Sequence, residues 1–178
     1  IVHGVALKPG KPAILGIIDN KPVIGIPGYP VSSYLVFETF VTPLILKYIG
    51  LKEEKDLMVK AISSKKINSS LKNKELVRVN LGYVGDKLIA TPLSSGAGVT
   101  MSLVKADGIG IIPQNLEGIE AGGEMDVKLL KPLNRIKETL VSIGSHDIIM
   151  DILGDMMNLS SGHVGSMGGI LAMKIFPQ

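Results

Sequence analysis

Between residues 57 and 132 the chain consists of short apolar-rich segments of strand length, and this pattern limits the possible folds more than any other feature. Turn-forming pairs such as Gly85-Asp86 separate the segments. The predicted strands are residues 57–62, 75–81, 87–93, 109–112 and 125–130. Strands of this length and spacing are typical of a small barrel or sandwich. We therefore predict an all-β, β-barrel-like domain over residues 56–132.

Residues 1–55 predict a different order of elements: a strand, then a β-hairpin, then a helix. Two apolar runs at residues 13–18 and 23–26 are joined by Asp19-Asn20-Lys21-Pro22. Asp and Asn tolerate the positive φ angles of a primed hairpin turn, so the two runs are expected to pair.

A long helix is predicted at residues 31–49, because its apolar side chains recur every three or four positions. Ser32 or Ser33 is expected to cap its start, and Gly50 is expected to end it in a left-handed conformation. Pro43 lies inside the helix and predicts a kink just before it.

From residue 133 a third unit is predicted, with a strand at residues 140–144, helices at 148–157 and 168–173, and a Gly/Ser-rich loop between the helices. This order is the opening of an α/β domain. Charged residues at 52–56 mark the first domain boundary. We predict three units, 1–55, 56–132 and 133–178. Both ends are expected to be cuts through a structural unit, so that the chain is a fragment of something larger.

Composition excludes several classes of protein. The 17 lysines are scattered, there are two arginines, and aromatic residues make up 4% of the chain, which does not favour a nucleic-acid surface. The absence of cysteine excludes disulfides, thiolate zinc sites and cysteine nucleophiles, and it fits a cytoplasmic location. No apolar run reaches the roughly 18 residues of a membrane span.

Neither the histidines nor the carboxylate on the predicted helix indicate a metal site or a catalytic acid. His3, His146 and His163 match no ligand spacing, so no metal is assigned to them. Glu38 lies on the apolar helix and is expected to be a partly exposed or paired carboxylate.

Two loops have the chemistry of an anion site. The first loop is Lys8-Pro9-Gly10-Lys11-Pro12, which places two ammonium groups on one rigid turn. Such a turn suits an anionic substrate. The alternative interpretation is an ordinary solvated turn between strands. In residues 27–33, Pro-Gly-Tyr-Pro-Val-Ser-Ser, a strand ends and a helix begins. Free N–H groups and the helix dipole attract oxyanions at such a start, although an ordinary capped helix has the same sequence.

These motifs carry a resemblance to a known family. Residues 3–12 (HGVALKPGKP) and 25–32 (GIPGYPVS), followed by residues 91–98, 102–108 and 117–122, resemble the MoeA/gephyrin family of molybdopterin molybdotransferases in order and spacing. The resemblance covers residues 1–132. It implies the end of a molybdopterin-binding three-layer α/β domain followed by the family's C-terminal β domain.

The resemblance implies an activity in molybdenum cofactor biosynthesis: insertion of molybdate (or tungstate) into adenylylated molybdopterin with release of AMP, helped by Mg²⁺. It implies a homodimer in the cytoplasm in which the β domain approaches the partner's cleft. The implied substrate-binding residues are Lys8, Lys11, Pro27, Gly28, Pro30, Ser32, Arg78, Ser95, Gly96 and Ser102. The main acidic residues of the family are expected upstream of Ile1, so no catalytic residue is assigned and this piece alone is expected to be inactive.

Two positions depart from the family pattern: Tyr29 stands where members more often have Asn, and Gly4 stands where some have an additional lysine. The tail, residues 143–147 and 160–169, resembles the solute-binding-type domain that follows this enzyme in some archaea and bacteria. A rival hypothesis is a non-catalytic module that binds molybdate or tungstate, and a third is a dimerisation fragment that binds nothing.

Overall fold

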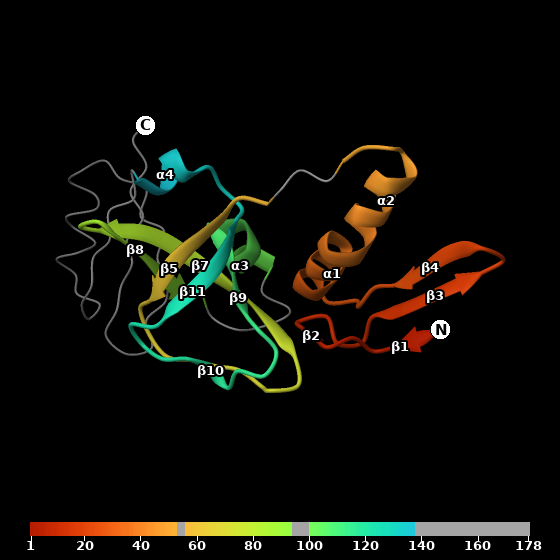
Figure 1. Cartoon of the computed structure of the whole chain (residues 1–178), viewed down its shortest axis with the longest axis horizontal. Coiled ribbons are helices and arrows are strands. Elements are labelled where there is room, and N and C mark those ends of the chain that lie inside the picture. Colours follow the sequence, from red (N-terminus) through yellow and green to blue (C-terminus); the bar gives the residue numbers. More distant parts are fainter. Residues whose placement is uncertain (53–55, 94–99, 138–178) are drawn as a thin grey trace.

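The computed structural model describes residues 1–52, 56–93 and 100–137 (Figure 1). A hairpin and a helical rod lie to one side of a barrel of strands. The first strands are β1 (Val2–His3), β2 (Leu7–Lys8), β3 (Ile14–Ile18) and β4 (Lys21–Gly25), of which β1, β3 and β4 form one antiparallel sheet. None of the helices within the described ranges is long and apolar enough to cross a membrane.

The predicted hairpin is confirmed. Ile18 of β3 pairs with Lys21 of β4, so the connecting loop has two residues. These are Asp19 with φ 48° and Asn20 with φ 59°, which is the type I′ conformation. Its twist matches that of the flanking strands, and short polar side chains tolerate it.

The predicted long helix is a rod of three pieces, α1 (Pro30–Val36), a π-helical turn η1 (Phe37–Val41) and α2 (Thr42–Tyr48). Pro43 has no N–H to donate to the preceding turn, and the widened π turn lies directly before it. The position at which the kink was expected is therefore occupied by a π turn.

The predicted N-terminal caps are wrong. Tyr29 is the N-cap residue, with no side-chain hydrogen bond, and α1 begins at Pro30. Ser32 is buried in the first turn, while the Ser33 hydroxyl donates back to the Pro27 carbonyl. A proline at the first helical position starts the helix without a side-chain cap, because it has no N–H to satisfy.

The predicted C-terminal cap is confirmed. Gly50 has φ 73° and donates its N–H to the Lys47 carbonyl at 3.3 Å, and the Leu51 N–H donates to the Leu46 carbonyl at 2.9 Å. This is a Schellman motif, which satisfies carbonyls that the helix end leaves without partners.

The five predicted strands are all present and close a small barrel. They are β5 (Met58–Ser63), β7 (Lys74–Val84), β8 (Lys87–Pro92), β9 (Gly108–Ile112) and β11 (Glu124–Leu129). They pair in the order β7-β8-β5-β11-β9, and β9 pairs again with β7. Two further short strands, β6 (Ile67–Asn68) and β10 (Gly118–Ile119), pair with each other.

The barrel core is aliphatic and includes a residue from beyond the predicted boundary. Its buried members are Ala61, Ile67, Val79, Leu81, Leu88, Ala90, Ile112, Met125, Val127 and Ile136. Ile136 lies on α4 (Leu133–Lys137), so the first residues assigned to the third unit pack on the barrel. The rest of that unit, residues 138–178, lies outside the described residues. Helix α3 (Thr100–Lys105) was not predicted either.

We expect Ile136→Val to lower the free energy of unfolding by about 0.5–1.5 kcal/mol, because it deletes one buried methylene from the barrel core. Ile136 has no exposed surface, whereas Ile45 on α2 is 46% exposed. Urea unfolding of Ile136→Val beside Ile45→Val measures the difference. Equal, negligible changes in both variants would show that α4 is not part of the barrel domain.

Strand β2 joins the N-terminal part to the barrel. It pairs in parallel with the start of β7, with Leu7 opposite Lys74 and Lys8 opposite Glu75. A second contact is apolar and places Val31 and Leu35 of α1 against Ile109 of β9. The N-terminal part is therefore attached to the barrel at two places, through β2 and through α1; Figure 1 shows both elements beside the barrel.

Candidate functional site

Lys8 lies at the junction between the two parts of the molecule. Its Nζ is 3.0 Å from Oε1 of Glu75. The Lys8 side chain is 54% exposed, whereas that of Glu75 is 14% exposed. One face of the ammonium is thus fixed by a nearly buried carboxylate, and the rest of it remains open to solvent.

The other predicted residues of the N-terminal part surround two turns. Lys11 is exposed on the turn that follows Lys8. Gly28 and Pro30 are exposed at the start of α1, whereas Pro27 and Ser32 are buried. The exposed backbone of this loop is available to a ligand, but the Ser32 hydroxyl lies inside the protein.

In the barrel the predicted residues lie in a buried polar layer. Arg78 of β7 is 7% exposed and Ser102 of α3 is 6% exposed, and burial lowers the pKa of Arg78. Asn80 and Thr91, which pair across β7 and β8, are equally buried. Ser95 and Gly96 lie outside the described residues.

Lys8 and Arg78 point to opposite faces of β7. Side chains alternate along a strand, and Arg78 is three positions from Glu75, the partner of Lys8. Three positions also separate them by about 10 Å along the strand. Within one chain the two cations therefore do not meet at a single anion.

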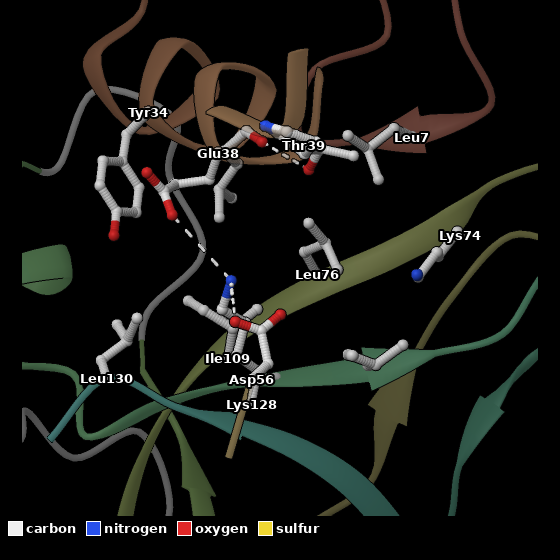
Figure 2. Close-up of a pocket in the computed structure, with 13 residues that line it drawn as sticks. Leu7, Tyr34, Glu38, Thr39, Asp56, Lys74, Leu76, Ile109, Lys128 and Leu130 are labelled. Atoms are coloured by element: carbon white, nitrogen blue, oxygen red, sulfur yellow. Dashed lines mark hydrogen bonds and ion pairs between the residues drawn. The ribbon is translucent and has the colours of Figure 1, made fainter. Parts of the chain in front are cut away.

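A cavity of about 220 Å³ lies between the helical rod and the barrel (Figure 2). Its lining is mixed, with seven apolar and six polar or charged residues. The apolar residues are Leu7, Leu35, Pro43, Leu76, Ile109, Ile111 and Leu130, and the polar ones are Tyr34, Glu38, Thr39, Asp56, Lys74 and Lys128. Among the described residues, none of the predicted substrate-binding residues lines it.

Lys128 of β11 neutralises the carboxylates of this cavity. Its Nζ is 2.8 Å from Oδ1 of Asp56 and 4.0 Å from Oε2 of Glu38. Figure 2 shows both contacts, with the Lys128 ammonium between the two carboxylates. The prediction that Glu38 is a paired, partly exposed carboxylate is confirmed, since its side chain is 33% exposed.

Burial raises the pKa of the Tyr34 phenol beside this cluster; Glu38 and Asp56 raise it further, and Lys128 lowers it. We therefore expect Lys128→Met to raise the pKa of Tyr34 and Glu38→Gln to lower it. The pKa of Tyr34 is higher in the folded chain than in the unfolded chain. The contribution of Tyr34 to stability is therefore fully present at a pH below its pKa in the unfolded chain, and it is lost as the pH rises through its pKa in the folded chain.

The pKa is measured by a ¹³C NMR titration of the Tyr34 ring, assigned with Tyr34→Phe. Lys66→Met, which removes an exposed pair with Glu120, is the control and should leave the pKa of Tyr34 unchanged. A pKa of Tyr34 that does not respond to the loss of Lys128 would contradict the electrostatic coupling.

The described residues contain no group of three or more His, Cys, Asp or Glu side chains that could hold a metal ion. No magnesium ligand is assigned among them, and no step of the chemistry is assigned to a metal that they would hold.

Sequence reasoning did not find Glu75 or the cavity. The sequence predicts Glu75 in a strand, as observed, but its partner Lys8 lies on β2, which has two residues and no periodicity of its own. The cavity depends on how the rod packs on the barrel, for which the sequence holds no local signal.

Comparison with known protein families matches residues 60–130, most of the barrel, to the MoeA C-terminal region (domain IV). A molybdopterin biosynthesis protein of Methanocaldococcus jannaschii is 40% identical over 135 residues, which is 74% of this chain and 30% of the relative. A molybdopterin molybdenumtransferase of Bacillus subtilis is 28% identical over 75% of this chain and 31% of its own length. The chain thus spans about a third of the curated relatives it matches.

A solved structure supports the same relationship. The molybdopterin biosynthesis MoeA protein of Pyrococcus horikoshii superposes with a TM-score of 0.58 at 38% identity, over 74% of this chain and 32% of that protein. The resemblance inferred from the motifs is therefore confirmed, whereas the solute-binding-type tail stays a prediction. Residues 60–130 form a MoeA C-terminal region, and the chain belongs to the MoeA family.

Proposed function

We propose that the full-length protein containing this chain inserts molybdate into adenylylated molybdopterin and releases AMP. The observation that carries the proposal is the match of residues 60–130 to the MoeA C-terminal region. The names of the relatives, which include molybdopterin molybdenumtransferases of several bacteria, support the same activity.

The chemistry that this chain offers is the binding of anions. The phosphates of the substrate and molybdate are all negatively charged, and the Lys8 ammonium has N–H groups beyond the one that contacts Glu75. Lys11 and the exposed Gly28 backbone are the other groups that would contact the anions. In this proposal Lys8 neutralises phosphate or molybdate, and the loop that precedes α1 positions it.

We propose further that residues 1–55 form the end of a three-layer α/β domain. The β3–β4 hairpin has exposed apolar side chains on both of its faces, including Ile17 at 73% and Ile18 at 53%, which alternate along β3. Sheets with apolar residues on both faces are those covered by helices on both sides. The hairpin therefore has the composition of a strand pair in a larger covered sheet.

The proposed homodimer explains how Lys8 and Arg78 contribute to one substrate. They lie on opposite faces of β7 in one chain, so a shared anion needs Lys8 of one copy and the barrel of another. In this arrangement the segment from Gly96 to Ser102 approaches the partner's cleft. Sedimentation equilibrium of the full-length protein tests the dimer, and a monomer at micromolar concentration would rule it out.

The proposal places the protein in the cytoplasm and gives it Mg²⁺ as a helper ion and molybdate or tungstate as the inserted oxyanion. No magnesium ligand is assigned in this chain. The ligands of the ion, like the catalytic acids, are proposed to come from other parts of the full-length protein.

The test is AMP release by the full-length protein from adenylylated molybdopterin, with molybdate, tungstate or sulfate added in turn. We expect release with molybdate or tungstate and none with sulfate. Calorimetric titration with the same three anions accompanies the assay. Tight molybdate binding without AMP release would overturn the enzymatic proposal and favour the non-catalytic oxyanion-binding module.

A further inference from the structure

We propose that Glu75 is a positioning residue for the proposed reaction: its carboxylate fixes the Lys8 ammonium in the orientation that the anion requires. The inference rests on the proposed function of Lys8. It adds a residue that belongs to β7 of the barrel, whereas Lys8 belongs to β2.

Neighbouring strands pair with the backbone of Glu75 on both edges of β7. Glu75 pairs with Lys8 of β2 on one side of β7 and with Ile112 of β9 on the other. Ile112 has no exposed surface and belongs to the barrel core. A carboxylate on a strand between two neighbours is a rigid anchor, whereas lysine has a flexible four-carbon side chain.

The carboxylate of Glu75 also depends on Lys8. Its second oxygen, Oε2, is buried and has no hydrogen-bond partner among the described residues. A buried carboxylate is costly without a counter-ion, so rotation of Glu75 away from Lys8 would leave the charge uncompensated. The 3.0 Å contact is therefore the favoured arrangement of both side chains.

The contact with Glu75 fixes the orientation of the Lys8 ammonium before an anion binds. Lysine has three N–H donors, and one of them is directed to Glu75, so two remain for a phosphate or molybdate oxygen at a fixed place. Donors that are already oriented stabilise charge that develops in the transition state without reorganisation. The Glu75 charge also opposes tight binding of the anion in the ground state, so its benefit is expected in kcat and not in KM.

The test compares Glu75→Gln, Glu75→Asp and wild type in the full-length protein, with kcat and KM for molybdate measured from AMP release. We expect Glu75→Gln to lower kcat roughly 10- to 100-fold without raising KM, because the ammonium loses its fixed position. Glu75→Asp, which keeps the charge, should recover part of the loss. Glu124→Gln, which removes a carboxylate from an exposed pair with Lys60, is the matched control and should leave both constants unchanged.

A second readout is the mobility of the Lys8 ammonium in full-length protein labelled with ¹⁵N-lysine. Relaxation should report a restricted ammonium in wild type and a mobile one in Glu75→Gln. An unchanged kcat in Glu75→Gln, or a raised KM with constant kcat, would overturn the inference about Glu75. If the wild-type protein is active in the same assay, the proposed function is unaffected by that result. A wild-type protein that releases no AMP would overturn the proposed function and this inference with it.

Discussion

Asp107→Ala is expected to lower the free energy of unfolding by about 1–3 kcal/mol, because it removes a fully buried carboxylate and leaves its buried hydrogen-bond donor unsatisfied. Asp107 has no exposed surface, and its Oδ1 is 3.2 Å from the Lys131 ammonium. Its Oδ2 accepts the Leu81 N–H at 3.0 Å. Without the carboxylate, this N–H is left unsatisfied inside the barrel.

The main chain of Asp107 adds to the effect. Its N–H donates to the Val79 carbonyl, and its own carbonyl accepts from the N–H groups of Leu130 and Lys131. The residue thus ties the end of α3 to β7 and to the segment after β11. Displacement of its backbone after the substitution would therefore weaken three parts of the barrel.

Urea unfolding followed by circular dichroism measures the change. Asp126→Ala is the control, since Asp126 is 49% exposed in a pair with Lys60 on the barrel surface, where such pairs contribute little. Similar losses in the two variants would show that Asp107 is not the buried anchor described above.

Lys8→Met is expected to lower kcat/KM of the full-length protein by roughly 10²–10³, the usual cost of removing one donor that stabilises developing negative charge. The substitution keeps an apolar chain of similar length and removes only the ammonium. Lys8→Arg should recover part of the activity, because it keeps the charge but changes the donor geometry.

Stability must be measured with activity in these variants. Loss of Lys8 leaves the nearly buried Glu75 carboxylate without its ion-pair partner, so Lys8→Met is also expected to unfold at a lower temperature. Lys8→Met combined with Glu75→Gln should regain stability without regaining activity. A double variant that regains both would show that Lys8 has only a structural role.

The sequence predicts elements whose signals are local. The barrel strands are predicted because short apolar-rich segments are separated by turn-forming pairs, and the hairpin because Asp19 and Asn20 fit a two-residue turn. The end of the helix at Gly50 followed from the same kind of local rule. The caps at Ser32 and Ser33 failed because Pro30 starts the helix one turn earlier than a serine cap requires.

Elements that depend on distant contacts were missed. Strand β2 has only two residues and exists because β7 pairs with it, and α4 follows from the burial of Ile136 against strands distant in sequence. For the same reason the site was predicted in part: Lys8 could be chosen from its motif, but Glu75 could not. The burial of Arg78 likewise depends on β7 packing within the barrel domain and not on its neighbours in sequence.

In the proposed reaction, the full-length protein couples insertion of molybdenum to the release of AMP. The most direct measurement is to incubate it with adenylylated molybdopterin and molybdate, and to determine molybdenum in the pterin product and free AMP in the same sample. We expect equal amounts of both, and neither when molybdate is omitted. AMP released without molybdenum in the product, or molybdenum bound with no AMP released, would contradict it.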